Sequence, residues 1–250
     1  MIKLSAIIIA KNSAELISEC IESVKFCDEI IVVDGYSTDS TVEIAKSLGA
    51  IVVEGSPTDF SKQRMVGLQK AKGEWVLYVD TDERVSKELA KNILETFEYF
   101  DDRVSVYKIK RKNFYLGDHA WPKIEKLERL FRKKDLSNWY GQLHESPSFT
   151  GLTSELEGYL LHYTHRDLFS MLVKTNLWSE IEAKLRLEAN HPPVVWWRFF
   201  RVFLTGFWNS YIDQRGFTVG TAGLIESIYQ GFSMFVTYAK LWEMQQEKKK

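Results

Sequence analysis

WVLYVDTDERVS, Trp75 to Ser86, is the stretch that decides how the first half of this chain is interpreted. Five mostly apolar residues run directly into DTDE, so a buried strand is expected to end in the acids Asp80, Asp82 and Glu83. One interpretation is a solvated turn that caps the next helix. The other is a divalent-metal site, because two carboxylates separated by one residue offer the hard oxygen ligands that Mg²⁺ and Mn²⁺ prefer.

Short apolar runs alternate with helical patterns over the first hundred residues. Strands are predicted at 4–10 (LSAIIIA), 29–34 (EIIVVD), 51–54 (IVVE) and 74–80 (EWVLYVD). Amphipathic helices are predicted between and after them, at 14–25, 39–48, 59–72 and 86–100. Alternation at this spacing is typical of an α/β fold with a mostly parallel sheet that is flanked by helices on both faces.

Acidic residues follow two of the predicted strands. Asp34 ends EIIVVD and precedes the turn GYSTDST, while Asp80 and Asp82 follow the fourth strand. In open parallel sheets, ligands bind in the crevice beyond the carboxyl ends of the strands. The sequence therefore predicts that these three acids line one crevice.

The pattern changes from Val104 onward. Strands of a less regular, mixed section are predicted at 104–117, 126–134 and 156–165. A long amphipathic helix is predicted over 167–190, and the prolines of HPP end it. We therefore expect an α/β domain over residues 1–165 and a helical, aromatic-rich region over 166–250.

The bulk composition excludes some classes of protein. Of the 250 residues, 45% are hydrophobic and 27% are charged, as in a folded protein, and the formal net charge of -1 gives no global field for binding nucleic acid. Cys20 and Cys27 are interpreted as packed thiols in a reducing compartment. The N-terminal apolar run is too short for a signal peptide and is better interpreted as a strand. We therefore expect a cytoplasmic protein.

Four further motifs surround the acids in a fixed order. AKNS ends the first strand, VVDGYSTDST ends the second, SKQRMVGLQKAKGEW covers the third helix, and GQLHESP follows in the second half. Together with DTDE, they resemble the pattern of glycosyltransferase family 2 on a GT-A, Rossmann-like fold. The likeness is to small bacterial enzymes of the lipopolysaccharide-core glucosyltransferase type. It covers residues 3–145 with specific motifs and continues more loosely to YAKLWE at 238–243.

The resemblance implies an inverting transfer of a sugar from a nucleoside-diphosphate donor, expected to be a UDP-sugar, to a hydroxyl of a lipid-linked or lipopolysaccharide-type glycan. An Mg²⁺ or Mn²⁺ ion would stabilise the charge of the leaving nucleoside diphosphate. Asp82 would be its main ligand, and Asp80 would contact the ribose or the water shell of the metal. Glu83 would have a supporting structural role or cap the following helix. The residues implied in nucleotide-sugar binding are Ala10, Lys11, Asn12, Asp34, Arg64, Asp80, Arg129 and His144.

One position departs from the family pattern. Asp34 would face the nucleotide base, and many relatives carry a second acid directly after it. This chain has Gly35 at that position. The base contact is therefore expected to differ in detail from that of the relatives.

The same resemblance points to Glu145 in LHES as the general base that takes the proton of the acceptor. Partial burial would suit a carboxylate to this task, and the alternative interpretation is an acid in a surface turn. His144 would position Glu145 or touch the phosphates, or it is a hydrogen-bonded structural residue. Arg64 is alternatively an exposed helix arginine. Arg129 and Arg132 would flank the diphosphate or the acceptor, or they are part of a solvated strand face.

The C-terminal region is rich in aromatic residues. VVWWRFFRVFLTGFW, which begins at Val194, is too apolar for an ordinary surface helix and places Arg198 and Arg201 on one face. A spanning helix needs about 20 apolar residues and disfavours central arginines, whereas an interfacial helix combines aromatics with arginines. We expect residues 194–250 to contact the inner face of the cell membrane peripherally, with the lysine tail favouring anionic lipid. A homo-oligomer interface, helices packed on the catalytic domain and a true span are the alternatives.

Two other functions compete with glycosyl transfer. A sugar nucleotidyltransferase should carry a Gly-rich loop with Lys or Arg directly after the first strand, and AKNSAEL has no glycine. A catalytically inactive, glycan-binding scaffold relative would not need Asp80, Asp82 and Glu145, all of which are present. The sequence therefore favours the glycosyltransferase.

Overall fold

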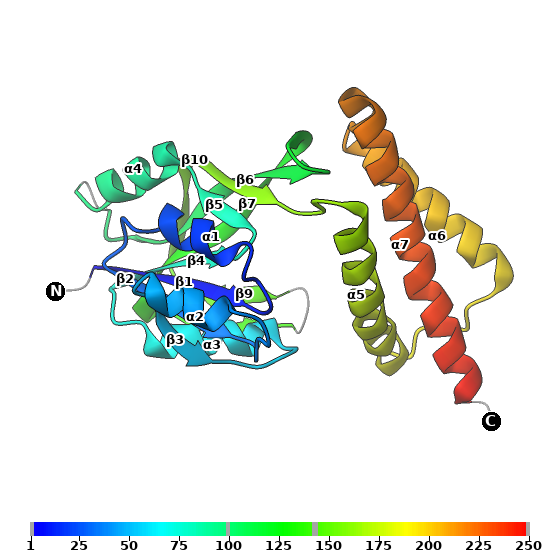
Figure 1. The fold of residues 1–250 in the computed structure, drawn as a ribbon, viewed down its shortest axis with the longest axis horizontal. Helices are drawn as coiled ribbons and strands as arrows, with labels where there is room; N and C mark the ends of the chain where they lie inside the picture. Colours follow the sequence, from blue (N-terminus) through cyan, green and yellow to red (C-terminus); the bar gives the residue numbers. More distant parts are fainter. Residues whose placement is uncertain (1–2, 99–100, 142–144, 249–250) are drawn as a thin grey trace. The chain divides into compact units, whose positions relative to one another are not determined.

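The computed structural model describes residues 3–98, 101–141 and 145–248, and Figure 1 shows its elements. The chain forms two compact units. The first, here called the sheet unit, comprises 1–112 and 125–162, and the second, the helical unit, comprises 113–124 and 163–250. The domain boundary predicted at residue 165 stays a prediction.

One mixed sheet organises the sheet unit. In the described residues its order is β3-β2-β1-β4-β7-β6-β10-β5. The strands are β1 (Leu4–Ala10), β2 (Glu29–Asp34), β3 (Ile51–Glu54), β4 (Trp75–Asp80), β5 (Glu83–Val85), β6 (Val104–Tyr115), β7 (His119–Arg132) and β10 (Leu152–Tyr163). Strands β3, β2, β1 and β4 are parallel, and β7 joins β4 antiparallel. The prediction of a mostly parallel sheet followed by a mixed section is confirmed.

Helices cover both faces of this sheet (Figure 1). They are α1 (Ile17–Ser23), α2 (Thr41–Ser47), α3 (Phe60–Lys70) and α4 (Lys87–Thr96). Side chains alternate along β1, so Ala6 and Ile8 share a core cluster with residues of α1, α2 and α4, while Ile7 and Ile9 belong to a second cluster with α3. A second, two-stranded sheet of β8 (Leu136–Tyr140) and β9 (Ser146–Phe149) packs into the second cluster and follows the short 3₁₀ turn η1 (Lys133–Asp135).

Helix α3 is held in place by its N-terminal cap and by one glycine. Asp59 caps its N-terminus, because its Oδ1 accepts a hydrogen bond from the backbone N–H of Lys62 (3.1 Å). At Gly67, a Cβ atom would lie 2.3 Å from the Ile7 side chain of β1. The glycine therefore lets α3 approach the sheet closely, which fixes the position of Arg64 on this helix.

The register of the parallel strands brings the predicted acids together. Ala10 of β1 is paired with Asp34 of β2, and its neighbour Ile9 is paired with Asp80 of β4. Parallel strands present their carboxyl ends at one edge of the sheet. Asp34 and Asp80 therefore lie at the same edge of the sheet, and the crevice predicted there stays a prediction.

The described part of the helical unit contains three α-helices that pack against one another. They are α5 (Leu168–Glu188), α6 (Trp196–Trp208) and α7 (Gly220–Glu247), with a π-helical turn η2 (Asn209–Asp213) and a 3₁₀ turn η3 (Gly216–Val219) before α7. Helix α7 packs against both α5 and α6. At Gly231 of α7, a Cβ atom would lie 2.7 Å from the Phe203 carbonyl oxygen of α6, so the glycine permits close backbone approach. None of the helices in the described residues combines the length and apolar character needed to cross a membrane.

Candidate active site

Two turns at the carboxyl edge are tied together by hydrogen bonds. Asn12, which follows β1 with a positive φ of 48°, donates its N–H to the Ser37 hydroxyl (2.8 Å). Its side-chain oxygen accepts the N–H of Thr38 (2.8 Å), and the carbonyl of Ala10 accepts the N–H of Gly35 (2.8 Å). These contacts form a preorganised wall beside Asp34.

Asp34 itself keeps one acceptor unused. It is 5% exposed, and its Oδ2 accepts the backbone N–H of Ser37 (3.0 Å), while Oδ1 has no hydrogen-bond partner in the described structure. A buried, unsatisfied carboxylate oxygen costs free energy unless a ligand donor meets it. At Gly35, a Cβ atom would lie 2.8 Å from the Gln63 side-chain nitrogen. The buried Gln63 therefore occupies the space beside the position where relatives carry a second acid.

Arg64 connects two predicted site residues. Its Nη2 donates to Oδ1 of Asp80 (3.0 Å), and its Nε and Nη2 donate to Oε1 of Glu145 (2.9 and 2.6 Å). The guanidinium carbon lies 4.9 Å from the ring centroid of Trp139, and Arg64 is 2% exposed. Arg64 is therefore buried within the site and is not an exposed helix arginine.

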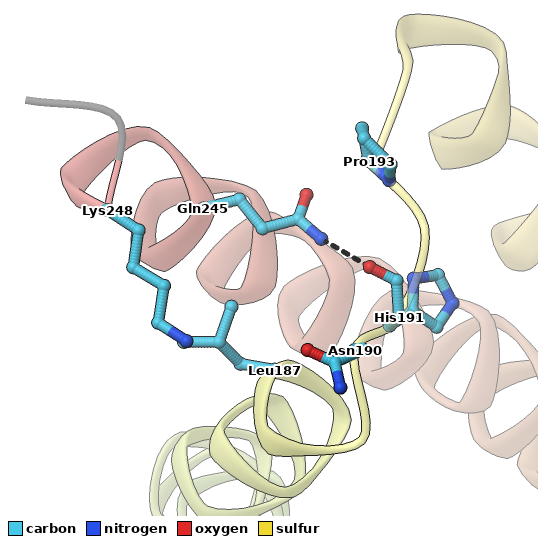
Figure 2. Close-up of a pocket in the computed structure, with 6 residues that line it drawn as sticks. All are labelled: Leu187, Asn190, His191, Pro193, Gln245 and Lys248. Carbon is cyan, nitrogen blue, oxygen red and sulfur yellow. Dashed lines mark hydrogen bonds between the residues drawn. The ribbon is translucent and has the colours of Figure 1, made fainter.

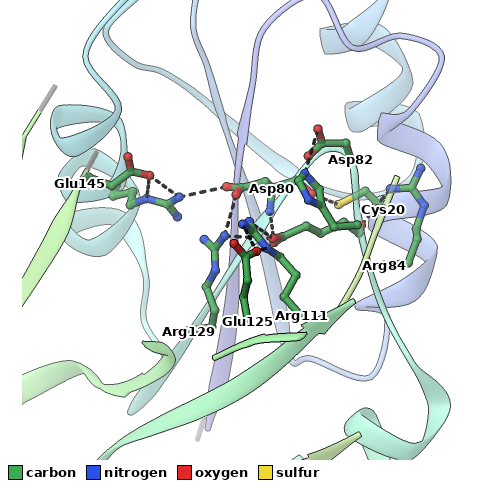
Figure 3. A network of polar contacts seen from close by, with 11 residues as sticks. Cys20, Asp80, Asp82, Arg84, Arg111, Glu125, Arg129 and Glu145 are labelled. Atoms are coloured by element: carbon green, nitrogen blue, oxygen red, sulfur yellow. Dashed lines mark hydrogen bonds and ion pairs between the residues drawn. The ribbon is translucent and has the colours of Figure 1, made fainter. Parts of the chain in front are cut away.

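Ion pairs continue from Asp80 to two further arginines (Figure 3). Asp80 Oδ2 accepts from Arg129 Nη2 (2.7 Å), and the same nitrogen donates to Oε1 of Glu83 (3.0 Å). Arg111 donates to that Glu83 oxygen (3.2 Å) and to Glu125 (2.7 and 2.9 Å). We call this alternating set of charges the ion-pair row, and its members in order are Glu145, Arg64, Asp80, Arg129, Glu83, Arg111 and Glu125.

The row fixes the charge of Asp80. Burial alone would raise the pKa of Asp80, but Arg129 and Arg64 hold it well below its ordinary range. The backbone N–H of Asp80 also donates to Oε2 of Glu83 (3.0 Å), which is fully buried. Glu83 thus accepts hydrogen bonds from the backbone at the end of β4 and from two arginines. Arg129 is buried and is not part of a solvated strand face.

Asp82 lies beside a histidine that sequence reasoning missed. Strand β5 pairs antiparallel with β10 and sets Glu83 opposite His162. Oδ2 of Asp82 is consequently 3.3 Å from Nε2 of His162. Nothing in the local sequence YLLHYTH signals this contact, because only the pairing of two strands far apart in the chain creates it.

Asp82 and His162 fit the protein's share of a divalent-metal site. One carboxylate and one imidazole, with side chains 18% and 14% exposed, offer an oxygen and a nitrogen donor, and a nitrogen donor favours Mn²⁺ over the harder Mg²⁺. Within the described ranges, no three His, Cys, Asp or Glu side chains gather closely enough to hold a metal by themselves. Asp80 has both oxygens on arginines, so its predicted metal contact stays a prediction. The remaining ligands would come from water and from the phosphates of a donor.

The remaining predicted residues lie in different surroundings. Lys11 donates its ammonium to the Pro57 carbonyl (3.0 Å) at the wall described above. Arg132 is paired with Trp75, at the opposite end of β4 from Asp80, and donates a hydrogen bond to Asp102 (3.2 Å). It therefore lies away from Asp80 and Asp82. His144 lies outside the described residues.

A separate pocket belongs to the helical unit. It has a volume of about 280 Å³ and lies between the C-terminal ends of α5 and α7 (Figure 2). The Gln245 side chain closes one side by donating to the His191 carbonyl (3.1 Å). Its described lining residues are Leu187, Asn190, His191, Pro193, Gln245 and Lys248, and they include no carboxylate. The pocket therefore lacks the acids that the sequence singled out.

Known proteins resemble this chain along most of its length. The sequence profile of Glycosyl transferase family 2 matches residues 5–157. An uncharacterized glycosyltransferase of Rickettsia prowazekii (strain Madrid E) is 33% identical over 258 residues, which cover 98% of this chain and 88% of that protein. The lipopolysaccharide core biosynthesis glycosyltransferase LpsC of Rhizobium meliloti (strain 1021) is 27% identical over 259 residues, with coverages of 96% and 92%.

Solved structures give more distant likenesses. Glucosyl-3-phosphoglycerate synthase from Mycobacterium tuberculosis, in complex with Mn²⁺, UDP and phosphoglyceric acid, is 23% identical with a TM-score of 0.38. The match covers 46% of this chain and 44% of that one, so it spans less than half of either protein. TarS of S. aureus, residues 1–349, is 17% identical with a TM-score of 0.47 and coverages of 98% and 92%.

Proposed function

This chain is a glycosyltransferase that belongs to glycosyl transferase family 2, and we propose that it is an inverting, metal-dependent enzyme that uses a UDP-sugar. The proposed acceptor is a hydroxyl of a lipid-linked or lipopolysaccharide-type glycan, and the similarity to LpsC supports that class. One observation carries the proposal. The ion-pair row joins Glu145, the candidate base, through Arg64 to Asp80 at the strand end that precedes Asp82.

Asp34 is the proposed contact for the nucleotide base. Its buried Oδ1 lacks a partner among the described residues, and an ionised carboxylate accepts hydrogen bonds only. An N–H group on the edge of a base such as uracil would satisfy it. Ala10 and Asn12 hold the adjacent wall through backbone hydrogen bonds, which would keep the turn after Asp34 in place for a nucleotide.

The balance of charge explains why a divalent cation would be required. The carboxylates of the ion-pair row and of Asp82 number five, against three guanidinium groups, which leaves two formal negative charges in the described site. A negatively charged donor would be repelled from this site. Asp82 and His162 would hold Mn²⁺ or Mg²⁺, which when bound neutralises this charge and that of the leaving phosphate.

Glu145 would act as the general base. The acceptor oxygen forms a bond to the anomeric carbon of the sugar, the acceptor proton passes to the Glu145 carboxylate, and the bond to the phosphate oxygen breaks. Arg64 occupies Oε1, and Oε2 has no partner among the described residues. The second oxygen is therefore the proposed proton acceptor.

Asp82→Ala tests the metal role. We expect Mn²⁺-dependent release of UDP from a UDP-sugar to fall about 1,000-fold, because the bound ion supplies several kcal/mol of charge stabilisation. A matched control is Asp101→Ala, which removes an exposed aspartate paired with Arg103. If Asp82→Ala and the control both keep full Mn²⁺-dependent activity, the role of Asp82 as a metal ligand is wrong.

We also propose peripheral contact between the helical unit and the inner face of the cell membrane. Gly206 lies against the backbone of Gln230, which defines the inner side of α6. At about 3.6 residues per turn, Trp197, Leu204 and Trp208 fall on the opposite, exposed side. Arg198 and Arg201 accompany them, and aromatics combined with arginines suit an anionic lipid interface. The protein is expected to co-sediment with anionic but not with neutral vesicles. If it binds neither kind of vesicle, the proposed membrane contact is contradicted.

A further inference from the structure

Arg64 holds the candidate base by a geometry that only an arginine provides. We propose that Arg64 is a positioning residue whose guanidinium places Glu145 for proton abstraction and ties that placement to the donor. This inference rests on the proposed function, in which Glu145 is the base. It assigns to Arg64 a task beyond contact with the nucleotide.

The contacts use the guanidinium as a fork. Two of its nitrogens, Nε and Nη2, donate to the same oxygen of Glu145 (2.9 and 2.6 Å), and Nη2 also reaches Asp80 (3.0 Å). A planar guanidinium offers five donors in a rigid arrangement, whereas a lysine ammonium acts as a point charge. Lysine at this position would keep the charge and lose the shared contacts.

The fork itself is immobilised by the core of the sheet unit. The Tyr78 hydroxyl donates to the backbone carbonyl of Arg64 (3.2 Å), and the guanidinium carbon lies 5.4 Å from the Tyr78 ring and 4.9 Å from the Trp139 ring. Glu145, by contrast, lies between β8 and β9 outside regular secondary structure. The immobilised arginine would therefore fix the position of a base that lies outside regular secondary structure.

One nitrogen of the Arg64 guanidinium, Nη1, remains available to bind the nucleotide-sugar donor. Nη1 of Arg64 is buried without a hydrogen-bond partner in the described part of the chain. A buried, unpaired N–H group costs free energy, and an anionic oxygen would satisfy it with a charge-assisted hydrogen bond. A phosphate oxygen of the donor on Nη1, with Glu145 on Nε and Nη2, would place the base relative to the bond that breaks.

A double-mutant cycle tests the coupling, with turnover of a UDP-sugar and calorimetric affinity for UDP with Mn²⁺ as the two readouts. Arg64→Lys should lower kcat about 100-fold, comparable to a lost general base, whereas UDP affinity should fall only several-fold, because the lysine ammonium keeps a positive charge for the phosphate. Glu145→Gln should lower kcat similarly, and the double variant should be no slower than Glu145→Gln alone. Arg132→Lys, a buried arginine of β7 outside the row, is the matched control and should turn over normally.

The outcomes separate the two proposals. If Glu145→Gln turns over normally, the assignment of the base fails. If Glu145→Gln is inactive but the two losses multiply, or if Arg64→Lys loses UDP affinity while its kcat is normal, the positioning role is overturned while the base stands. If Arg64→Lys does not fold, Glu145→Asp carries the test, because its shorter side chain should miss the fork and lower kcat with UDP affinity intact. Normal turnover by Glu145→Asp overturns the positioning role.

Discussion

The ion-pair row of the sheet unit and the outer face of α6, the exposed side that carries Trp197, Leu204 and Trp208, depart from the usual placement of residues in opposite ways. Charged groups are buried in the row, where Glu83 is fully enclosed and Arg129 is 5% exposed. Large aromatic groups are exposed on α6, where Trp196 is 75% and Phe200 is 67% exposed. Buried charges and exposed apolar patches are the two departures that ask for a functional explanation.

The two departures differ in what they do to stability. A buried charge is tolerated only while every partner is present, so each carboxylate of the row is tied to the fold. An exposed aromatic has few partners to lose, so its removal should leave the fold intact. We therefore expect substitutions in the ion-pair row to change both stability and activity. Substitutions on the outer face of α6 should change only binding to the membrane.

Glu83→Gln should produce the largest effect on stability. It leaves Arg129 and Arg111 without their shared carboxylate charge, and breaking a buried pair costs about 3–5 kcal/mol. Urea unfolding measures the loss. Glu128→Gln on β7 is the control, because its pair with Lys108 is partly exposed and should contribute less than about 1 kcal/mol. Equal losses in the two variants would remove the distinction between the row and a surface pair.

Asp59→Ala should produce an intermediate effect. Asp59 caps α3, which carries Arg64, and loss of a cap costs about 1 kcal/mol. Asp167→Ala removes the cap of α5 in the helical unit and should cost about the same, since both side chains accept a backbone N–H. A much larger loss for one of them would show that the cap also supports tertiary packing.

The contribution of Asp59 should also depend on pH. Partial burial alone would raise the pKa of Asp59, but hydrogen bonds from the Lys62 backbone and the Ser61 hydroxyl lower it. A lowered folded-state pKa gives stability that is present above the unfolded value of about 3.9 and is lost as pH falls through the folded value. The gap between wild type and Asp59→Ala should therefore shrink below about pH 4, and a gap that widens there contradicts the assignment.

Trp208→Ser should have the smallest effect on stability, within about 0.5 kcal/mol, because the side chain is exposed. Binding to anionic vesicles should nevertheless weaken, since an interfacial tryptophan is removed. Leu152→Ser, at an exposed apolar residue of β10 in the sheet unit, is the matched control and should bind vesicles normally. Unchanged binding by Trp208→Ser would exclude the outer face of α6 from the contact.

Local patterns predicted the elements that carry the acids. The apolar runs of β1, β2 and β4 and the positions of α3 and α5 could be predicted, because each depends on neighbours a few residues away. The short strands β5, β8 and β9 were not predicted, since each is defined mainly by its partner strand. Glu145 was predicted from a motif, but its contact with Arg64 was not.

The sequence by itself determined the α/β alternation, the family motifs, and the placement of Asp34 and Asp80 at strand ends. Only the tertiary structure decided which charges meet. Sheet order sets β7, β6 and β10 beyond β4, and this order brings Arg129 to Asp80, Arg111 to Glu83 and His162 to Asp82. Periodicity records the surroundings of a residue along the chain, whereas an ion pair depends on strands that are distant in sequence. The acids of WVLYVDTDERVS were therefore visible from the sequence, and their partners were not.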